Sequence, residues 1–198
     1  MKITILIFCS LLFINVNAQT KNVSDKAQIK NVVTGFYNWY NKNWKKVNAF
    51  KLYSGTGADK EVPPFRVDWK EVDRYTVWMK KNASYFTNQY FINERKDFQW
   101  ADSMIQTEPE SEIMYGFDYD RFTISQEEPQ WFVNELNRKA NKWNITINGN
   151  KANISVISLD VNTKENWEVF CGEMHKEKNV WKISRLGCDT TEEQLKKH

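Results

Sequence analysis

An aromatic stripe at helical spacing in residues 24–50 is the strongest constraint that this sequence places on its fold. Apolar residues recur at steps of three and four, which is the spacing of one helix face, and they are Ile29, Val33, Phe36, Tyr40, Trp44 and Val47. Ser24 or Asp25 can cap the first turn, and lysines near residue 45 complement the helix dipole at the other end. Because large aromatic side chains bury much apolar area, the chain must supply a broad surface that covers this stripe.

The covering surface is predicted in the C-terminal third, where the hydrophobic period changes from about four residues to two. The alternation predicts strands over residues 143–147, 152–156, 167–171 and 181–183. Tight turns, at Asn148-Gly149-Asn150 and across 176–179, join neighbouring strands into an antiparallel meander. Helices followed by such a sheet indicate one α+β domain, in which the N-terminal helices pack on a curved C-terminal antiparallel sheet.

The region between the first helix and the sheet divides into four parts. Residues 51–66 carry two glycines and a Pro-Pro pair, which predict a loop. Helices are predicted over 68–81 and 84–105, and residues 106–130 are broken by glycine and proline. A short helical turn is expected after Pro129.

Residues 1–18 have the pattern of a cleaved secretory signal, so the domain is expected to comprise residues 19–198. A positive start at Lys2 is followed by a short apolar run, and Ala18 supplies a small residue before the cut. The run is short for a membrane span, and the sequence has no second run of that length. We expect a secreted protein of the periplasm or the extracellular space, with no lipid anchor and no membrane span.

Composition argues against several classes of function. The formal net charge is +3 at pH 7, and basic residues occur in pairs rather than in the stripe that phosphate binding requires, so no nucleic-acid partner is expected. With two histidines in the chain, one of them terminal, the sequence offers no imidazole zinc site and no evident Ser-His or Cys-His pair. We therefore predict no catalytic residue, no metal ligand and no cofactor.

Residues 117–122 read Phe-Asp-Tyr-Asp-Arg-Phe, and Gln126-Glu127 and Trp131 follow them. This pattern, the first helix and the closing strand at 180–183 together resemble an uncharacterised family of exported bacterial domains. The resemblance implies the cone-like fold of nuclear transport factor two and the steroid isomerases, in which a curved sheet wraps a long helix. The chain departs from the family pattern at Arg121, where an aromatic is usual, and at Glu127, where Asp is usual. The family has no settled biochemical role, so the resemblance implies a fold and an exported location but no reaction.

Six residues are candidates for contact with a ligand. Asp118 and Asp120 can offer oxygen ligands or a base, or they can fix turns through their short side chains. Aromatic side chains can line a pocket for sugars or flat ligands, or they can belong to the core. The four candidates of this kind are Tyr40, Trp44, Trp143 and Trp167.

Three classes of function stay open at this stage. The first is a non-catalytic binding module that uses an aromatic-lined cavity or rim. The second is a protein-interaction or inhibitor role, such as neutralising a toxin in the periplasm. The third is an enzyme of the isomerase or dehydratase kind, which needs an acid and a donor that converge in the cavity. The identity of the small-molecule or protein partner and the oligomeric state do not follow from the sequence.

Two local features lead to specific expectations about the sheet. Ala152, Ile154 and Val156 share one parity, and Ile157, Leu159 and Val161 share the other, which predicts a β-bulge or sharp bend near Val156-Ile157.

The second expectation concerns the two cysteines of the domain. A turn at Glu177-Lys178 would place Cys171 opposite Ser184 and separate it from Cys188 by four residues. That offset is about 13 Å at the strand rise, beyond the roughly 7 Å between α-carbons that a disulfide tolerates. The oxidising compartment favours a disulfide and the predicted register opposes it, so the pairing stays open.

Finally, the aromatic stripe is expected to lie against the sheet, with Trp143 and Trp167 as partners. The hydroxyl of Tyr40 must then meet a polar group or open towards a cavity, because an unpaired buried hydroxyl is costly.

Overall fold

The structure of the chain is a computed structural model that describes residues 24–55, 62–112, 114–117, 119–159 and 166–187. Helices precede an antiparallel sheet, which confirms the predicted α+β class. The elements are α1 (Asp25–Val47), β1 (Tyr53–Gly55), β2 (Phe65–Val67), α2 (Trp69–Asn82), α3 (Asn88–Thr107), α4 (Pro129–Leu136), β3 (Lys142–Asn148), β4 (Lys151–Leu159), β5 (Asn166–Glu177) and β6 (Val180–Leu186). The predicted signal segment, residues 1–18, lies outside the described residues.

Helix α1 begins where the sequence predicts. Ser24 is its N-cap, and the side-chain oxygen accepts a hydrogen bond of 3.3 Å from the N–H of Ala27. The helix ends at Val47, three residues earlier than expected, and Asn48 closes it by donating its N–H to the carbonyl of Trp44. Its buried face therefore runs along nearly the whole length of the element.

Two features of the helical half differ from the prediction. Helix α3 begins at Asn88 rather than Ser84, because residues 85–87 pair with β6. The N–H of Thr87 donates to the carbonyl of Ile183 over 2.9 Å, and the N–H of Ile183 donates to the carbonyl of Tyr85 over 2.8 Å. The predicted loop 51–66 also contains a short ladder, in which β1 pairs antiparallel with β2. A strand of three residues is too short to show a period of two, so spacing could not predict it.

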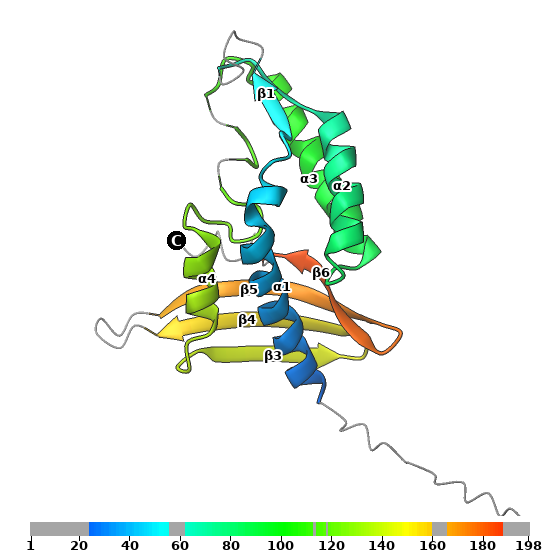
Figure 1. Cartoon of the computed structure of the whole chain (residues 1–198), viewed down its shortest axis with the longest axis vertical. Helices are drawn as coiled ribbons and strands as arrows, with labels where there is room; N and C mark the ends of the chain where they lie inside the picture. The colour runs from blue at the N-terminus through cyan, green and yellow to red at the C-terminus, as the bar shows by residue number, and fades with distance from the viewer. Residues whose placement is uncertain (1–23, 56–61, 113, 118, 160–165, 188–198) are drawn as a thin grey trace, which may run out of the picture.

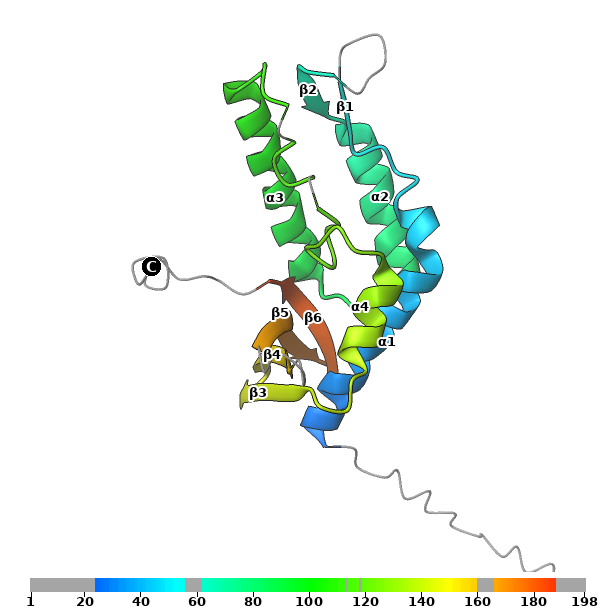
Figure 2. The same cartoon turned by 90° about the vertical axis from the view of Figure 1, so that its left-hand side faces the viewer.

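The helices divide between two places in the molecule. Figure 1 shows α1 and α4 crossing one face of the sheet, while α2 and α3 extend away from it towards the β1–β2 ladder. In Figure 2 the connection between α3 and α4 runs through the space between α3 and the pair α1 and α2. Two helices thus cover the sheet as expected, and the cone-like shape is not confirmed.

The sheet has the strand order β3-β4-β5-β6, and every neighbouring pair is antiparallel. A register shift between Val156 and Ile157 confirms the predicted irregularity. Its cause differs from the one expected, because the extra residue, Val169, belongs to β5. Strand β4 keeps its parity and turns Ile157 towards the other face, whereas Val169 and Phe170 are consecutive buried residues of β5.

The predicted register of the last hairpin is wrong. Glu177 pairs with Val180, so the turn lies one residue later than the expected turn at Glu177-Lys178. The register between β5 and β6 shifts again between Glu173 and Met174. The N–H of Gly187 consequently donates to the carbonyl of Cys171 over 3.0 Å, whereas Ser184 was expected opposite Cys171. Cys188 lies outside the described residues.

The corrected register removes the offset that argued against a disulfide. Gly187 lies beside Cys171, and Cys188 is the next residue of the sequence. We therefore expect protein produced through a secretory route to contain no free sulfhydryl from these two residues. Thiol titration of the unfolded, unreduced protein checks this, and two titratable thiols in the secreted domain would contradict it.

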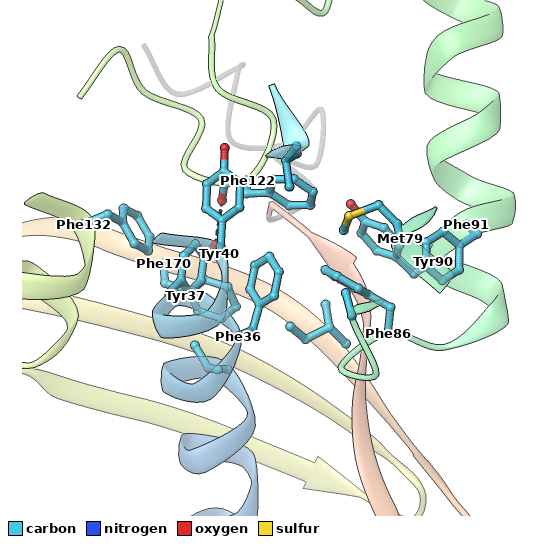
Figure 3. Close-up of a cluster of buried hydrophobic side chains, with 14 of the residues drawn as sticks. Phe36, Tyr37, Tyr40, Met79, Phe86, Tyr90, Phe91, Phe122, Phe132 and Phe170 are labelled. Atoms are coloured by element: carbon cyan, nitrogen blue, oxygen red, sulfur yellow. Dashed lines mark hydrogen bonds between the residues drawn. The ribbon is translucent and has the colours of Figure 1, made fainter. Parts of the chain in front are cut away.

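The core is centred on Phe36, which lies between two groups of aromatic rings. Figure 3 shows Tyr37 with Phe132 and Phe170 on one side, and Phe86 and Tyr90 on the other. The ring of Phe36 is 4.8 Å from that of Phe86 and 5.3 Å from that of Phe122. Tyr37, which falls outside the predicted stripe, is the residue of α1 whose ring contacts the sheet, at 5.9 Å from Phe170.

Phe36→Ala should lower the free energy of unfolding by about 3–5 kcal/mol, because it opens a cavity where the two ring groups meet. Denaturant unfolding followed by circular dichroism measures the change. Val77→Ala, at an exposed position of α2, is the control and should change it by less than about 0.5 kcal/mol. A loss below about 1 kcal/mol for Phe36→Ala would show that the two groups of rings do not depend on this residue.

Candidate functional site

Two cavities lie on either side of the connection between α3 and α4. Cavity 1 has a volume of about 680 Å³ and lies between this connection, the end of α1 and the residues that follow it. Cavity 2 has a volume of about 580 Å³ and lies between the same connection, α3 and the end of β6. Tyr119, Asp120 and Arg121 border both cavities and form the wall between them.

Asp120 holds this wall in place. One carboxylate oxygen accepts hydrogen bonds of 3.0 Å from the N–H groups of Phe122 and Thr123, and the other accepts the hydroxyl of Tyr40. The predicted turn-forming role of an aspartate in this segment is therefore present at Asp120. Asp118, the other predicted acid, lies outside the described residues.

Tyr40 is buried, as expected, and its hydroxyl meets a polar group at the wall of cavity 1. Its ring contacts Phe36 and Phe122, so the side chain is directed towards the connection between α3 and α4. Burial, and then the neighbouring Asp120, raise the pKa of Tyr40 well above its ordinary range. The phenol therefore stays protonated and acts as a hydrogen-bond donor.

A buried carboxyl, Glu94, lies on α3 at the wall of cavity 2, and only 3% of its surface is exposed. Its Oε1 accepts the hydroxyl of Tyr75 over 2.8 Å and that of Tyr90 over 3.1 Å. Analysis of the sequence missed this residue, although a signal was present. Glu94 falls between Tyr90 and Phe98 at steps of four on the buried face of the helix, where a carboxylate is unexpected.

Arg121 completes the buried polar cluster. Its Nη2 lies 3.7 Å from Oε1 of Glu94, and its guanidinium lies 4.0 Å from the ring centre of Phe98. Two atoms of this cluster, Nε of Arg121 and Oε2 of Glu94, are buried without a hydrogen-bond partner among the described residues. Arg121 is thus the cation that faces the buried acid.

The predicted tryptophans are not brought together with Tyr40. Trp44 is half-buried against the core. Trp143 lies under the ammonium group of Lys30, 5.4 Å from the ring centre, and Trp167 lies under the guanidinium of Arg138 at the same distance. Neither Trp143 nor Trp167 borders cavity 1 or cavity 2, so the structure separates these two candidates from Tyr40 and Asp120.

Within the described ranges, no cluster of three His, Cys, Asp or Glu side chains has the arrangement of a metal site. Among the helices of the described residues, none has both the length and the apolarity needed to cross a membrane. Comparison of the chain with protein-family models, curated proteins and solved structures gave no match. The function is therefore inferred from the residues of the two cavities.

Burial raises the pKa of Glu94, while Arg121 and the two tyrosine hydroxyls oppose the shift. A carboxyl with a raised pKa in the folded state binds more protons there than in the unfolded chain. Its contribution to stability is therefore present below the unfolded value, about 4.3, and is lost as pH rises through the folded value.

Glu94→Gln should remove this loss of stability with rising pH. As pH rises from about 4.3, the unfolded value, the free energy of unfolding of the variant should fall less than that of the wild type. Urea unfolding at a series of pH values measures the slope. Glu112→Gln, at an exposed position, is the control and should follow the wild type. Identical slopes for the wild type and Glu94→Gln would contradict the shift.

Proposed function

We propose that this protein is an exported, non-catalytic binding module that holds a small ring-shaped molecule in cavity 1. The observation that carries the proposal is the combination of aromatic walls with carboxylates that are already engaged. The aromatic residues that line the cavity are Tyr40, Phe50, Tyr53, Tyr75, Phe117, Tyr119 and Phe122. Such walls offer wide apolar contact to the face of a sugar or a flat ring.

The state of the two acids in cavity 1 disfavours an enzyme that uses one of them as a base. Asp120 accepts three hydrogen bonds, as described above. Asp68 is the N-cap of α2, and its Oδ1 accepts the N–H groups of Lys70 and Glu71 over 3.1 and 3.0 Å. A carboxylate that caps a helix or a turn is held by backbone donors, and these fix its position.

The edge of cavity 1 supplies the polar groups that a ring-shaped ligand needs for its orientation. Asn48, Lys51 and Ser54 follow the end of α1 and border the cavity, and Arg121 borders it from the opposite wall. A ligand with apolar faces and hydroxyl or carbonyl groups at its rim matches this division between aromatic wall and polar edge.

The proposed fold relationship and the proposed location support each other. The resemblance to exported cone-like domains and the secretory pattern of residues 1–18 are independent features of the sequence. A binding module outside the cytoplasm is consistent with both. The alternative of a protein inhibitor needs an exposed apolar patch. The exposed residues Trp100, Tyr119 and Ile124 all border cavity 2, which favours a small ligand over a flat protein surface.

Tyr40→Phe tests whether cavity 1 is a site. The probe is 4-nitrophenyl β-glucoside, which carries a flat ring and a sugar, and its affinity is measured by isothermal titration calorimetry. Loss of the hydroxyl frees Asp120 and loosens the cavity wall, so we expect the affinity to fall by about fivefold, as for one lost hydrogen bond.

Tyr90→Phe is the matched control, because its hydroxyl donates a buried hydrogen bond of 3.1 Å to Glu94, and neither residue borders cavity 1. This variant should lose stability and keep its affinity. Equal affinities in both variants and the wild type, or no binding of the probe, would show that the aromatic stripe is only core.

A further inference from the structure

Cavity 2 differs from cavity 1 in the character of its lining. Exposed apolar side chains and charged side chains both border it. Three of the large apolar residues that the described part of the chain exposes gather here, one from α3 and two from the connection between α3 and α4. Trp100 is 54% exposed, Tyr119 is 56% exposed and Ile124 is 61% exposed. We call these three residues the apolar rim.

Backbone geometry supports a role for this rim. Ile124 has a φ of 50°, which is rare for a β-branched residue and costs conformational energy. A hydrogen bond of 2.8 Å from its N–H to the carbonyl of Asp120 closes the turn that holds it there. The turn therefore keeps a strained apolar side chain in water at the mouth of a cavity, where glycine or asparagine would fit without strain.

The lining also supplies a cation with one unmatched donor atom. Of the three acids that border cavity 2, Asp120 is engaged by three donors and Glu94 shares one oxygen with two tyrosine hydroxyls, while Asp97 is exposed. Nε of Arg121 is buried with no acceptor within reach among the described residues. Lys96 adds a second positive charge at the same border.

We propose that cavity 2 binds a small amphipathic carboxylate, with the acid group on the side of Arg121 and Lys96 and the apolar chain against the rim of Trp100, Tyr119 and Ile124. The carboxylate supplies the acceptor that Nε of Arg121 lacks, and charge-assisted hydrogen bonds of this kind are stronger than neutral ones. The chain covers apolar surface that is otherwise exposed. This site is distinct from the one proposed in cavity 1, since Lys96, Trp100 and Ile124 border cavity 2 and not cavity 1.

Octanoate is the probe, and its binding to the full chain is measured by isothermal titration calorimetry. Octanol carries a chain of the same length without the charge, and acetate carries the charge without the chain. We expect saturable octanoate binding with one site, and affinities at least about tenfold weaker for octanol and acetate. Equal binding of octanoate and octanol, or no saturable octanoate binding below about 10 mM, overturns the proposal.

Matched variants test where the probe binds. Trp100→Ala should weaken octanoate binding by about tenfold, whereas Trp131→Ala, at a tryptophan that is 41% exposed and borders neither cavity, should leave it unchanged. Lys96→Gln should weaken it by about threefold, and Lys81→Gln, on the exposed end of α2, should not. Both test positions on α3 are exposed, so these variants keep the fold.

Two further variants separate this proposal from the one for cavity 1. Ile124→Asn should retain or raise the melting temperature, because it relieves the positive φ, and still weaken octanoate binding. Lys51→Gln, at an exposed residue that borders cavity 1 and not cavity 2, should leave octanoate binding unchanged. The same affinity in Trp100→Ala as in Trp131→Ala, or a loss of octanoate binding in Lys51→Gln alone, overturns the assignment to cavity 2.

Discussion

The described site depends on the hydrogen bonds that the carboxylate of Asp120 accepts. It joins the hydroxyl of Tyr40 on α1 to the backbone of the turn that follows Asp120, and this turn lies between two cavities. A long connection without regular structure has few backbone hydrogen bonds of its own, so side-chain acceptors must fix its course. The position of Tyr119 and Arg121, and therefore the shape of both cavities, follows from this one acid.

The buried pair of Glu94 and Arg121 is a second constraint, and its energetics differ from those of Asp120. Removing a carboxyl and a guanidinium from water is expensive, and the attraction between them offsets the cost only when their other hydrogen bonds are satisfied. Here one oxygen of the Glu94 carboxyl accepts hydrogen bonds from two tyrosine hydroxyls, and the Arg121 guanidinium lies over an aromatic ring. One polar atom of each residue has no hydrogen-bond partner among the described residues. An apolar pair would serve stability as well, so the cluster suggests selection for something other than stability.

Sequence patterns predicted what depends on periodicity and capping. The helices at 25–47 and 69–82, the meander and the irregularity at Val156 were all available from spacing, and for the first helix also from Ser24 as its cap. Features that depend on tertiary pairing were not predicted. Residues 85–87 pair with β6 instead of belonging to α3. The register shift at Glu173 places Gly187, rather than the expected Ser184, beside Cys171. Part of the site could be predicted: Tyr40 and Asp120 were named as candidates, and Glu94 was not. A buried acid on a helix is recognised only when the apolar face around it is traced.

The pairing of residues 85–87 with β6 has a consequence for association between copies of the chain. It covers part of the outer edge of β6 at Ile183, so the sheet presents a fully open edge only along β3 among the described strands. Growth of a sheet through successive molecules requires two open edges on each molecule. A second copy that paired with β3 would use up the open edge of both, so edge-to-edge assembly through this sheet ends at a two-fold dimer and cannot continue into a fibre.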